Sequence, residues 1–529
     1  MRHAEGSTLP DAPRAIARAA TLTSFGNLSS RVIGLVREMV KSFYFGNGQA
    51  ASAFELAANI PTQFYDLLIG GMLSSALVPT FSELADEDDP ARRRAFGELL
   101  GAVLGLSLLV LTLVVLVLWL LALPIARFIS GGPNQDPHLL AALLRLTIPA
   151  ILFLNLSGIL TAALHAHRRF VFTAFTATTY NAVMIICVIL LESRFGVMAL
   201  AGGLLAGSIA QVLIQVPGLR GVPLRLSLNW HLPGVRQVVR LFLPVAGGLL
   251  LAQIAVQVSF ILASRISAEG PATMRYAAQV IQFPLGMVAM AIATAILPAL
   301  SSAQGEAFKR TLAQWLRFVW VLTAPATIGI YVLAAPIVAL LFERGAFTPE
   351  STAYAAAALR AAAPGLLFAA VDTLLIYAFY AQRDTRTPTT IGIMSTLFYL
   401  VLVGAQTLLD EFGIRPFTLE ALVFTNSLKT GVDAALMGFF LWRKIGGLQG
   451  YGLGETVLKV SLALGVMAPA AHLTMEGLAA RFTLHTFLGN AVIALGSALV
   501  GALAYFLCAV LLRLAELEPL RALIARRLA

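Results

Sequence analysis

Polar and charged side chains line one side of the first apolar segment, residues 15–45. At 100° per residue they form two neighbouring stripes: Ser24, Asn27, Arg31, Glu38 and Ser42, and beside them Thr23, Ser30, Arg37 and Lys41. An arginine that faces lipid costs at least about 2.5–3.5 kcal/mol, so these side chains should line a water-filled cavity or pair inside a helix bundle. Guanidinium groups bind phosphate oxygens in pairs of hydrogen bonds. The pattern therefore favours anion binding by Arg31 and Arg37, and structural pairing with Glu38 is the alternative.

Other polar groups lie inside later apolar segments. Glu55 and Asp66 are eleven residues apart, nearly on one helical face, and Gln253 and Gln257 are one turn apart. Lys429 and Asp433 stand at i,i+4, which fits a self-neutralising pair and a coupling-ion site about equally. The sequence has no phosphate-cradling glycine loop, no HExxH and no nucleophile elbow. We therefore expect no catalytic residues, no metal site, no resident cofactor and no enzymatic activity.

The elements that position these residues are membrane helices. The chain has 529 residues, of which 58% are hydrophobic and 12% charged, whereas soluble domains carry about 25% charge. The net charge of +10 comes from basic residues scattered between apolar segments, which argues against nucleic-acid binding. Both cysteines lie inside apolar runs, so no disulfide framework is expected.

Windows of about 19 residues predict an all-α polytopic membrane protein with about fourteen transmembrane helices. The expected ranges are 15–45, 51–84, 95–122, 139–165, 171–191, 197–217, 236–266, 273–303, 308–334, 351–381, 388–409, 419–442, 456–479 and 486–513. Lys and Arg are concentrated in every second loop, which places both termini in the cytoplasm.

An internal repeat appears as three echoes in the same order. Segment 76–82 (ALVPTFS) resembles 295–301 (AILPALS), 123–126 resembles 335–338, and 163–168 resembles 378–383, at offsets of 219, 212 and 215 residues. One duplication explains them, and a repeat of six spans keeps both copies in the same orientation. We expect two six-helix lobes, residues 1–220 and 221–445, followed by two additional helices in 446–529.

Several motifs along the chain resemble those of the MurJ (MviN) lipid II flippase family, in the multidrug/oligosaccharidyl-lipid/polysaccharide (MOP) exporter superfamily. They are Ser30-Arg31-Val32-Ile33-Gly34-Leu35-Val36-Arg37-Glu38, Phe45-Gly46-Asn47-Gly48, Ala53-Phe54, Ile60-Pro61, Ala76-Leu77-Val78-Pro79, Gln282-Phe283-Pro284, Leu297-Pro298 and Thr387-Pro388. The resemblance implies the same two lobes and two extra helices, which are thought to form a groove for an undecaprenyl tail. It also implies a bacterial cytoplasmic (inner) membrane protein.

The resemblance further implies flipping of lipid II between leaflets by alternating access, with Arg31 and Arg37 holding the diphosphate in a central cavity. Sodium or the membrane potential would supply the driving force, and cell-wall synthesis enzymes and membrane lipids would be partners. Further cavity-lining candidates are Asn27, Glu38, Tyr65, Asp66, Gln253, Gln257, Gln279 and Gln282, and candidate ion-coupling residues are Asn426 and Asp433.

The chain departs from the family pattern at two cavity positions. Tyr65 and Gln279 stand where the family usually has arginines, and Gln282 replaces a nearby acid. Three alternatives to lipid II flipping therefore stay open: a flippase for another polyprenyl-diphosphate-linked glycan, another exporter of the superfamily, and a non-transporting scaffold. A drug exporter would favour an acidic cavity, which the arginines of the first span oppose.

Overall fold

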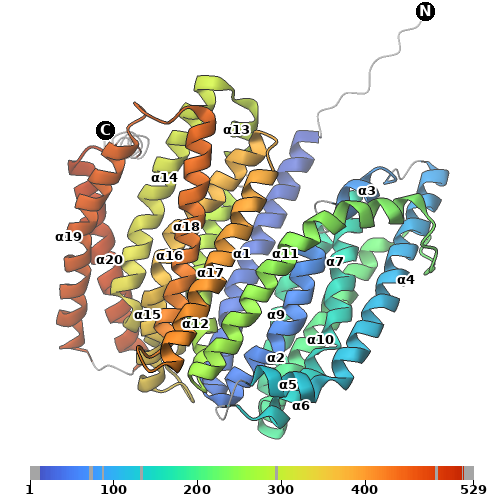
Figure 1. Ribbon diagram of the computed structural model, residues 1–529, viewed down its shortest axis with the longest axis horizontal. Helices are drawn as coiled ribbons and strands as arrows, with labels where there is room; N and C mark the ends of the chain where they lie inside the picture. Colours follow the sequence, from blue (N-terminus) through green and yellow to red (C-terminus); the bar gives the residue numbers. More distant parts are fainter. Residues whose placement is uncertain are drawn as a thin grey trace, which may run out of the picture. The chain divides into compact units, whose positions relative to one another are not determined.

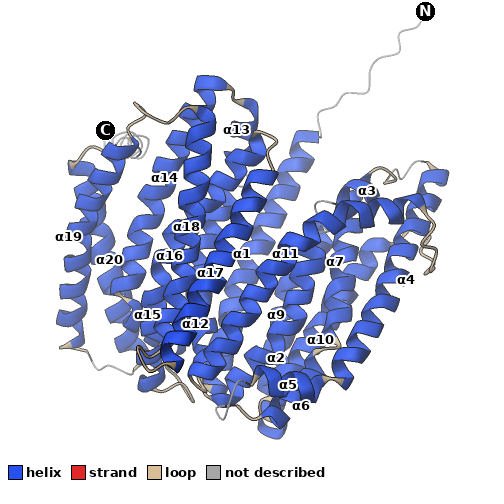
Figure 2. Ribbon diagram, in the orientation of Figure 1, coloured by secondary structure: helices blue, strands red, loops and turns tan. Residues whose placement is uncertain are grey.

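The computed structural model describes residues 12–70, 76–85, 89–130, 135–291, 296–482, 486–514 and 516. Within these ranges the regular structure is entirely helical, as Figure 2 shows. The predicted all-α membrane fold is confirmed.

Every predicted span contains a long helix or a broken pair of helices. The long helices are α1 (Ala12–Phe45), α2 (Gln49–Tyr65), α4 (Pro90–Leu120), α6 (Pro137–Thr147) with α7 (Ala150–Ala166), α9 (Thr176–Phe195), α10 (Met198–Gln215), α11 (Pro233–Ile266), α12 (Gly270–Ala291), α14 (Gly305–Val332), α16 (Pro349–Ala381), α17 (Arg386–Glu411), α18 (Leu419–Ile445), α19 (Leu453–Ala479) and α20 (Phe487–Leu511). Short elements between them are η1 (Asp66–Gly70), α3 (Val78–Ser82), α5 (Ala122–Ile129), α8 (Phe170–Ala174), η3 (Val216–Leu219), α13 (Leu297–Ser302) and α15 (Ala334–Phe342). Ten stretches in the described ranges are long and apolar enough to cross a membrane, so the count of fourteen crossings stays a prediction.

The chain forms two compact units. The first comprises Met1–Lys41 and Ala53–Gln253, and the second comprises Ser42–Ser52 and Ile254–Ala529. In the first unit an apolar core joins α4 and α7, which contact each other, and α7 also packs against α10. In the second unit, α16 packs against α12, α14 and α18, and α19 and α20 lie side by side against α14 (Figure 1). The predicted lobe boundaries themselves stay a prediction.

The sequence repeat has a counterpart in local structure. Each of the long helices α4 and α14 is followed, after one residue, by a short helix, α5 and α15, which contain the second pair of echoes. The third pair ends α7 and α16, where Arg168 and Arg383 adopt left-handed backbone angles, with φ of 56° and 58°. Non-glycine residues rarely take this conformation, so the same turn in both copies supports a duplication. Ala295 of the first pair lies outside the described residues.

The residue after each left-handed arginine ties the turn to a later part of its own unit. In the first unit, the Arg169 guanidinium donates to the carbonyl oxygens of Gly218 at 2.7 Å and Arg220 at 2.9 Å. In the second unit the equivalent residue is Asp384, which accepts from the Lys444 ammonium at 2.6 Å. The two copies thus close the same kind of turn with side chains of opposite charge.

The Asp384–Lys444 pair should stabilise the second unit over a defined pH range. The hydrogen bond from Lys444, followed by that from the Thr387 backbone N–H, lowers the pKa of Asp384 from its usual 3.8 to about 2. A lowered pKa stabilises the fold above pH 3.8, and this contribution disappears as the pH falls through about 2. Both side chains are partly exposed, so we expect at most about 1 kcal/mol.

This prediction can be checked by thermal unfolding of Lys444→Met in detergent. The unfolding midpoint should fall slightly and by the same amount from pH 8 to pH 5, and the difference from wild type should shrink below pH 4. Asp384→Asn is the control, because Lys444→Met should then add little. A difference that grows on acidification would contradict the pairing.

Candidate functional site

The helix that carries the two predicted anion-binding arginines is held against α8 and α9 by close contacts. A Cβ at Gly26 would overlap the carbonyl oxygen of Ala174, so only glycine allows α1 to approach this closely. One turn further along, the hydroxyls of Ser29 and Thr178 are 3.0 Å apart. These contacts place the middle of α1 beside the first half of α9.

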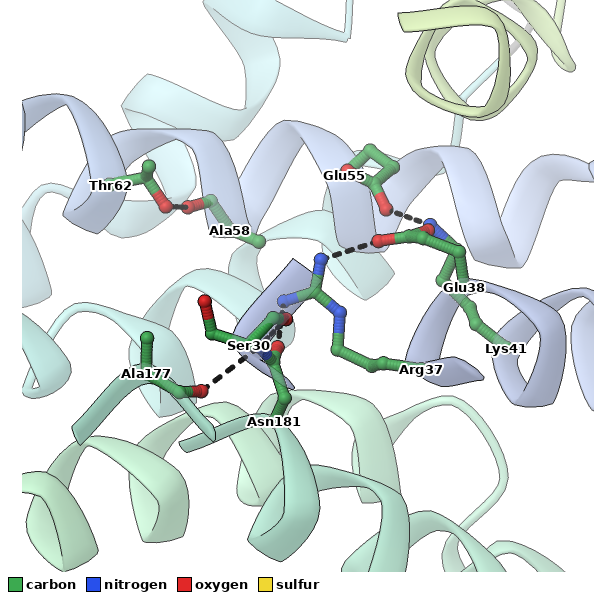
Figure 3. A network of polar contacts seen from close by, with 9 residues as sticks. All are labelled: Ser30, Arg37, Glu38, Lys41, Glu55, Ala58, Thr62, Ala177 and Asn181. Atoms are coloured by element: carbon green, nitrogen blue, oxygen red, sulfur yellow. Dashed lines mark hydrogen bonds and ion pairs between the residues drawn. The ribbon is translucent and has the colours of Figure 1, made fainter. Parts of the chain in front are cut away.

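Arg37 is fixed from two sides within the first unit. Its Nη1 donates to Oδ1 of Asn181 on α9 at 2.9 Å, and its Nη2 donates to Oε1 of the neighbouring Glu38. Figure 3 shows the guanidinium between these two partners. Asn181 is itself oriented by its side-chain amide, which donates to the carbonyl of Ala177 at 3.0 Å. The Arg37 side chain is 14% exposed.

Lys41 completes a four-charge network with α2. Its ammonium pairs with Glu38, one turn back, and with Glu55 across the helix pair (Figure 3). Lys41 and Glu38 are 1% exposed and Glu55 is 6% exposed. The network of Arg37, Glu38, Lys41 and Glu55 contains two cations and two anions and is therefore neutral. Structural pairing, the alternative to anion binding, is thus realised for Arg37 and Lys41, while the anion-binding role stays a prediction.

The other predicted residues of the first span differ in exposure. Arg31 is half-buried, and Asn27 is exposed, with its carbonyl oxygen accepting from the Ser30 hydroxyl at 2.9 Å. The side chains of Thr23 and Ser24 lie outside the described part of the chain. Arg31 therefore remains accessible in part to a ligand approaching the first unit.

Tyr65 and Asp66 lie where α2 changes into a wider helical turn. Tyr65 is the last residue of α2 and packs against the apolar core of the first unit. Asp66 opens the π-helical η1 and is exposed, whereas Glu55 is buried. The two acids therefore differ in burial, although the chain that joins them is α-helical up to Tyr65, and they do not form one buried acidic face.

The glutamines are placed on α11 and α12. Gln253, in the first unit, and Gln257, in the second, are half-buried one turn apart on α11. On α12, Gln279 is half-buried and Gln282 is exposed. Their predicted role as cavity-lining residues stays a prediction.

The second unit holds a charge cluster that sequence reasoning recognised only in part. Asp372 on α16 lies close enough to Asp433 and Lys429 on α18 for both charges to act on it. One carboxylate oxygen of Asp372 and one of Asp433 are buried and find no hydrogen-bond partner among the residues that the structure describes. Asn426, the other candidate ion-coupling residue, is exposed.

Close packing of α16 against α18 brings this cluster together. The Ser427 hydroxyl of α18 donates to the carbonyl of Ala361 on α16 at 2.9 Å, and a Cβ at Gly431 would press on the Phe368 ring. Two functional candidates were missed from sequence, Asp372 and Asn181. The only signal in the sequence was a polar side chain inside a predicted span, which does not by itself identify a partner or a role.

Comparison with known proteins identifies the family. The family described as "Lipid II flippase MurJ" matches residues 41–494. The probable lipid II flippase MurJ of Vibrio cholerae is 32% identical over 405 residues, which cover 73% of this chain and 76% of the relative. The lipid II flippase MurJ of Burkholderia cenocepacia is 28% identical over 439 residues, covering 78% and 84%.

Solved structures show the same fold. A lipid II flippase MurJ in an inward closed conformation superposes with a TM-score of 0.76 at 22% identity, covering 93% of this chain and 99% of that one. A multidrug-resistance MATE transporter of the MOP superfamily, in an inward-facing conformation, gives a TM-score of 0.62 at 14% identity, covering 79% and 95%. Taken with the arginine-bearing first helix and the multi-pass helical fold, these matches show that the chain belongs to the lipid II flippase MurJ family.

Proposed function

We propose that this protein flips lipid II from the inner to the outer leaflet of the bacterial cytoplasmic membrane, as a transporter without catalytic residues. Family membership and the function named for its relatives support lipid II as the substrate. Both termini would lie in the cytoplasm, and transport would proceed by alternating access. Membrane lipids and cell-wall synthesis enzymes are the further proposed partners.

The observation that carries this proposal is the held guanidinium of Arg37. Among the described residues, its side-chain hydrogen bonds to Asn181 and Glu38 use two of its five N–H donors, and the side chain keeps 14% of its surface exposed. The guanidinium is fixed before a ligand arrives, which reduces the conformational entropy lost on binding. Arg31, half-buried on the same helix, supplies the second cation for a diphosphate.

The test is outward translocation of lipid II in bacteria that are depleted of their own flippase and express this chain. Wild type should transport, and Arg31→Ala and Arg37→Ala should abolish transport while membrane insertion stays normal, because removing an intramembrane charge eases insertion. Arg415→Ala, at an exposed arginine between α17 and α18, is the charge-matched control. A wild-type protein that inserts but moves no lipid II would favour another lipid-linked glycan, or a scaffold.

The Asn181→Ala variant tests whether Arg37 acts only through its charge or must also be held in position. Asn181→Ala leaves the charge of Arg37 in place but removes its 2.9 Å anchor, so transport should fall without being abolished. The measurement is the same translocation assay. Loss equal to that of Arg37→Ala would mean that the amide, rather than the charge, is what transport requires.

We propose that the second unit binds the coupling ion. When both carboxylates are ionised, Asp372, Asp433 and Lys429 together carry one net negative charge. Buried carboxylate oxygens that lack partners among the described residues then favour a monovalent cation, either H⁺ or Na⁺. Ser395 of α17 lies within hydrogen-bonding reach of Asp433 and would provide a further oxygen.

Transport measurements on the reconstituted protein show whether H⁺ or Na⁺ is the coupled ion. Asp372→Asn should abolish stimulation of transport by an imposed ion gradient while leaving gradient-independent exchange, and the responding gradient, pH or sodium, names the ion. Joint replacement of Lys429 and Asp433 by Met and Leu serves as the contrast. Full gradient-driven transport by that double variant would reduce the pair to a structural, self-neutralising role.

A further inference from the structure

An apolar cavity of about 400 Å³ lies within the first unit, between α4, α7 and the end of α10. Its walls include Leu108 of α4, Leu156 of α7 and Val212 of α10, and its one charged lining residue is Arg220. The volume falls in the range of about 300–1,000 Å³ that is typical of small-molecule sites. None of the residues proposed for diphosphate or ion binding lines this cavity.

One side of the cavity is closed by an extended segment, residues 221–229, which we call the strap. The strap runs along α4, where the Ser227 backbone N–H donates to the carbonyl of Gly101 at 3.2 Å. Three glycines on one face of α4 let the strap lie against the helix backbone, because a Cβ at any of them would overlap a carbonyl oxygen of the strap. The pairs are Gly97 with Pro223, Gly101 with Arg225 and Gly105 with Ser227.

Side chains alternate along an extended chain, so every second strap residue can face the cavity. Leu224 and Leu226 line it, yet they are 39% and 62% exposed. The cavity wall on this side is therefore a thin layer that also faces the surroundings of the helix bundle.

Exposed arginines lie at the cavity and on the segments next to it. Arg220, just before the strap, and Arg225 on the strap are exposed, and Arg169 holds the backbone of Arg220 through the 2.9 Å hydrogen bond described above. Further exposed arginines stand on the segments next to the strap: Arg92, Arg93 and Arg94 at the start of α4, and Arg168 after α7. Acidic residues lie on the same segments: Glu83 follows α3, Asp89 caps α4 and Glu98 lies within it, and the sequence has three further acids at positions 86–88.

We propose that this cavity binds one acyl chain of a phospholipid whose anionic headgroup contacts Arg220. The apolar lining fits a hydrocarbon chain, and the guanidinium of Arg220 fits a phosphodiester that carries a net negative charge. A zwitterionic phospholipid offers the same chain without the net charge, so charge complementarity selects the anionic class. This lipid site is separate from the diphosphate site and does not depend on the proposed transport function.

The test uses delipidated full-length protein in detergent, titrated with phosphatidylglycerol or phosphatidylcholine and followed by native mass spectrometry. Wild type should retain one phosphatidylglycerol in preference to phosphatidylcholine. Arg220→Gln should reduce this preference by about fivefold, the effect of one basic residue near a membrane surface. Arg194→Gln, at an exposed arginine near the end of α9, is the charge control and should leave the preference unchanged.

A second pair of variants tests the cavity itself. Leu108→Trp places a larger side chain in the lining and should weaken retention of both lipids, whereas Leu109→Trp changes the adjacent exposed residue of α4, which does not line the cavity, and should not. Equal retention of the two lipids by wild type would overturn the anionic headgroup. Unchanged retention in Leu108→Trp, with the protein folded, would overturn the cavity as the binding site.

Discussion

Lys41→Met is expected to destabilise the first unit by about 3–5 kcal/mol, because it leaves the buried carboxylates Glu38 and Glu55 without their shared cation. Lys41 is 1% exposed, so water cannot take over the role of the ammonium. The network would change from neutral to a net charge of −1 inside the helix bundle. We expect a large drop in the thermal midpoint, measured as the loss of monodisperse protein in detergent after heating.

The matched control restores neutrality without restoring the ion pair. Lys41→Met combined with Glu55→Gln again has one cation, Arg37, and one anion, Glu38. This double variant should recover much of the stability lost in the single variant, since buried ion pairs can be replaced by neutral groups at small cost. A double variant as unstable as Lys41→Met alone would show that packing of the lysine stem, rather than charge balance, is what matters.

Gly101→Ala is expected to detach the strap from α4. The added Cβ would overlap the carbonyl oxygen of Arg225, which is backbone and has no rotamer with which to move aside. Overpacking of this kind costs about 1–3 kcal/mol. Cleavage by trypsin after Arg225 should therefore become on the order of tenfold faster, because proteolysis follows the population of the open segment.

Gly202→Ala on α10 is the appropriate comparison, because nothing lies within 4 Å of the Cβ that it adds. Both variants raise helix propensity equally, so the difference between them isolates the contact with the strap. If trypsin cleaves Gly101→Ala and Gly202→Ala at the same rate, the strap does not depend on the glycine face.

The long helices were predictable from sequence because a membrane span needs about 20 apolar residues, and apolar runs of that length marked where they lie. The breaks inside the predicted spans 51–84 and 273–303 were not predicted. Arg37 and Glu38 stood out for a related reason, since intramembrane charges are costly unless they serve a function or are paired. The partner of Lys41 was not predictable. Its pairing with Glu55 depends on the register of α2 against α1. The pattern of polar and apolar residues within one helix does not predict that register.

The contact between the strap and α4 could not be predicted from sequence for a different reason. Glycines spaced four apart in an apolar helix usually indicate close contact with another helix. In α4, glycines with the same spacing contact the strap instead, an extended segment about 120 residues further along the chain. The sequence of the strap contains no helix signals. Asp372 and Asn181 were missed because a single polar residue in an apolar run gains meaning only from the neighbours that tertiary packing supplies.

The neutral network also sets an order of events during biosynthesis. Lys41 meets Glu55 after only 14 further residues, so the first two helices can leave the insertion machinery as a charge-compensated hairpin. Arg37 and Asn181 are 144 residues apart. At a synthesis rate of about 5–20 residues per second, the amide is made roughly 7–29 s after the guanidinium. During that interval Glu38 is the partner that holds Arg37, and the contact between α1 and α9 forms only after α9 has been made.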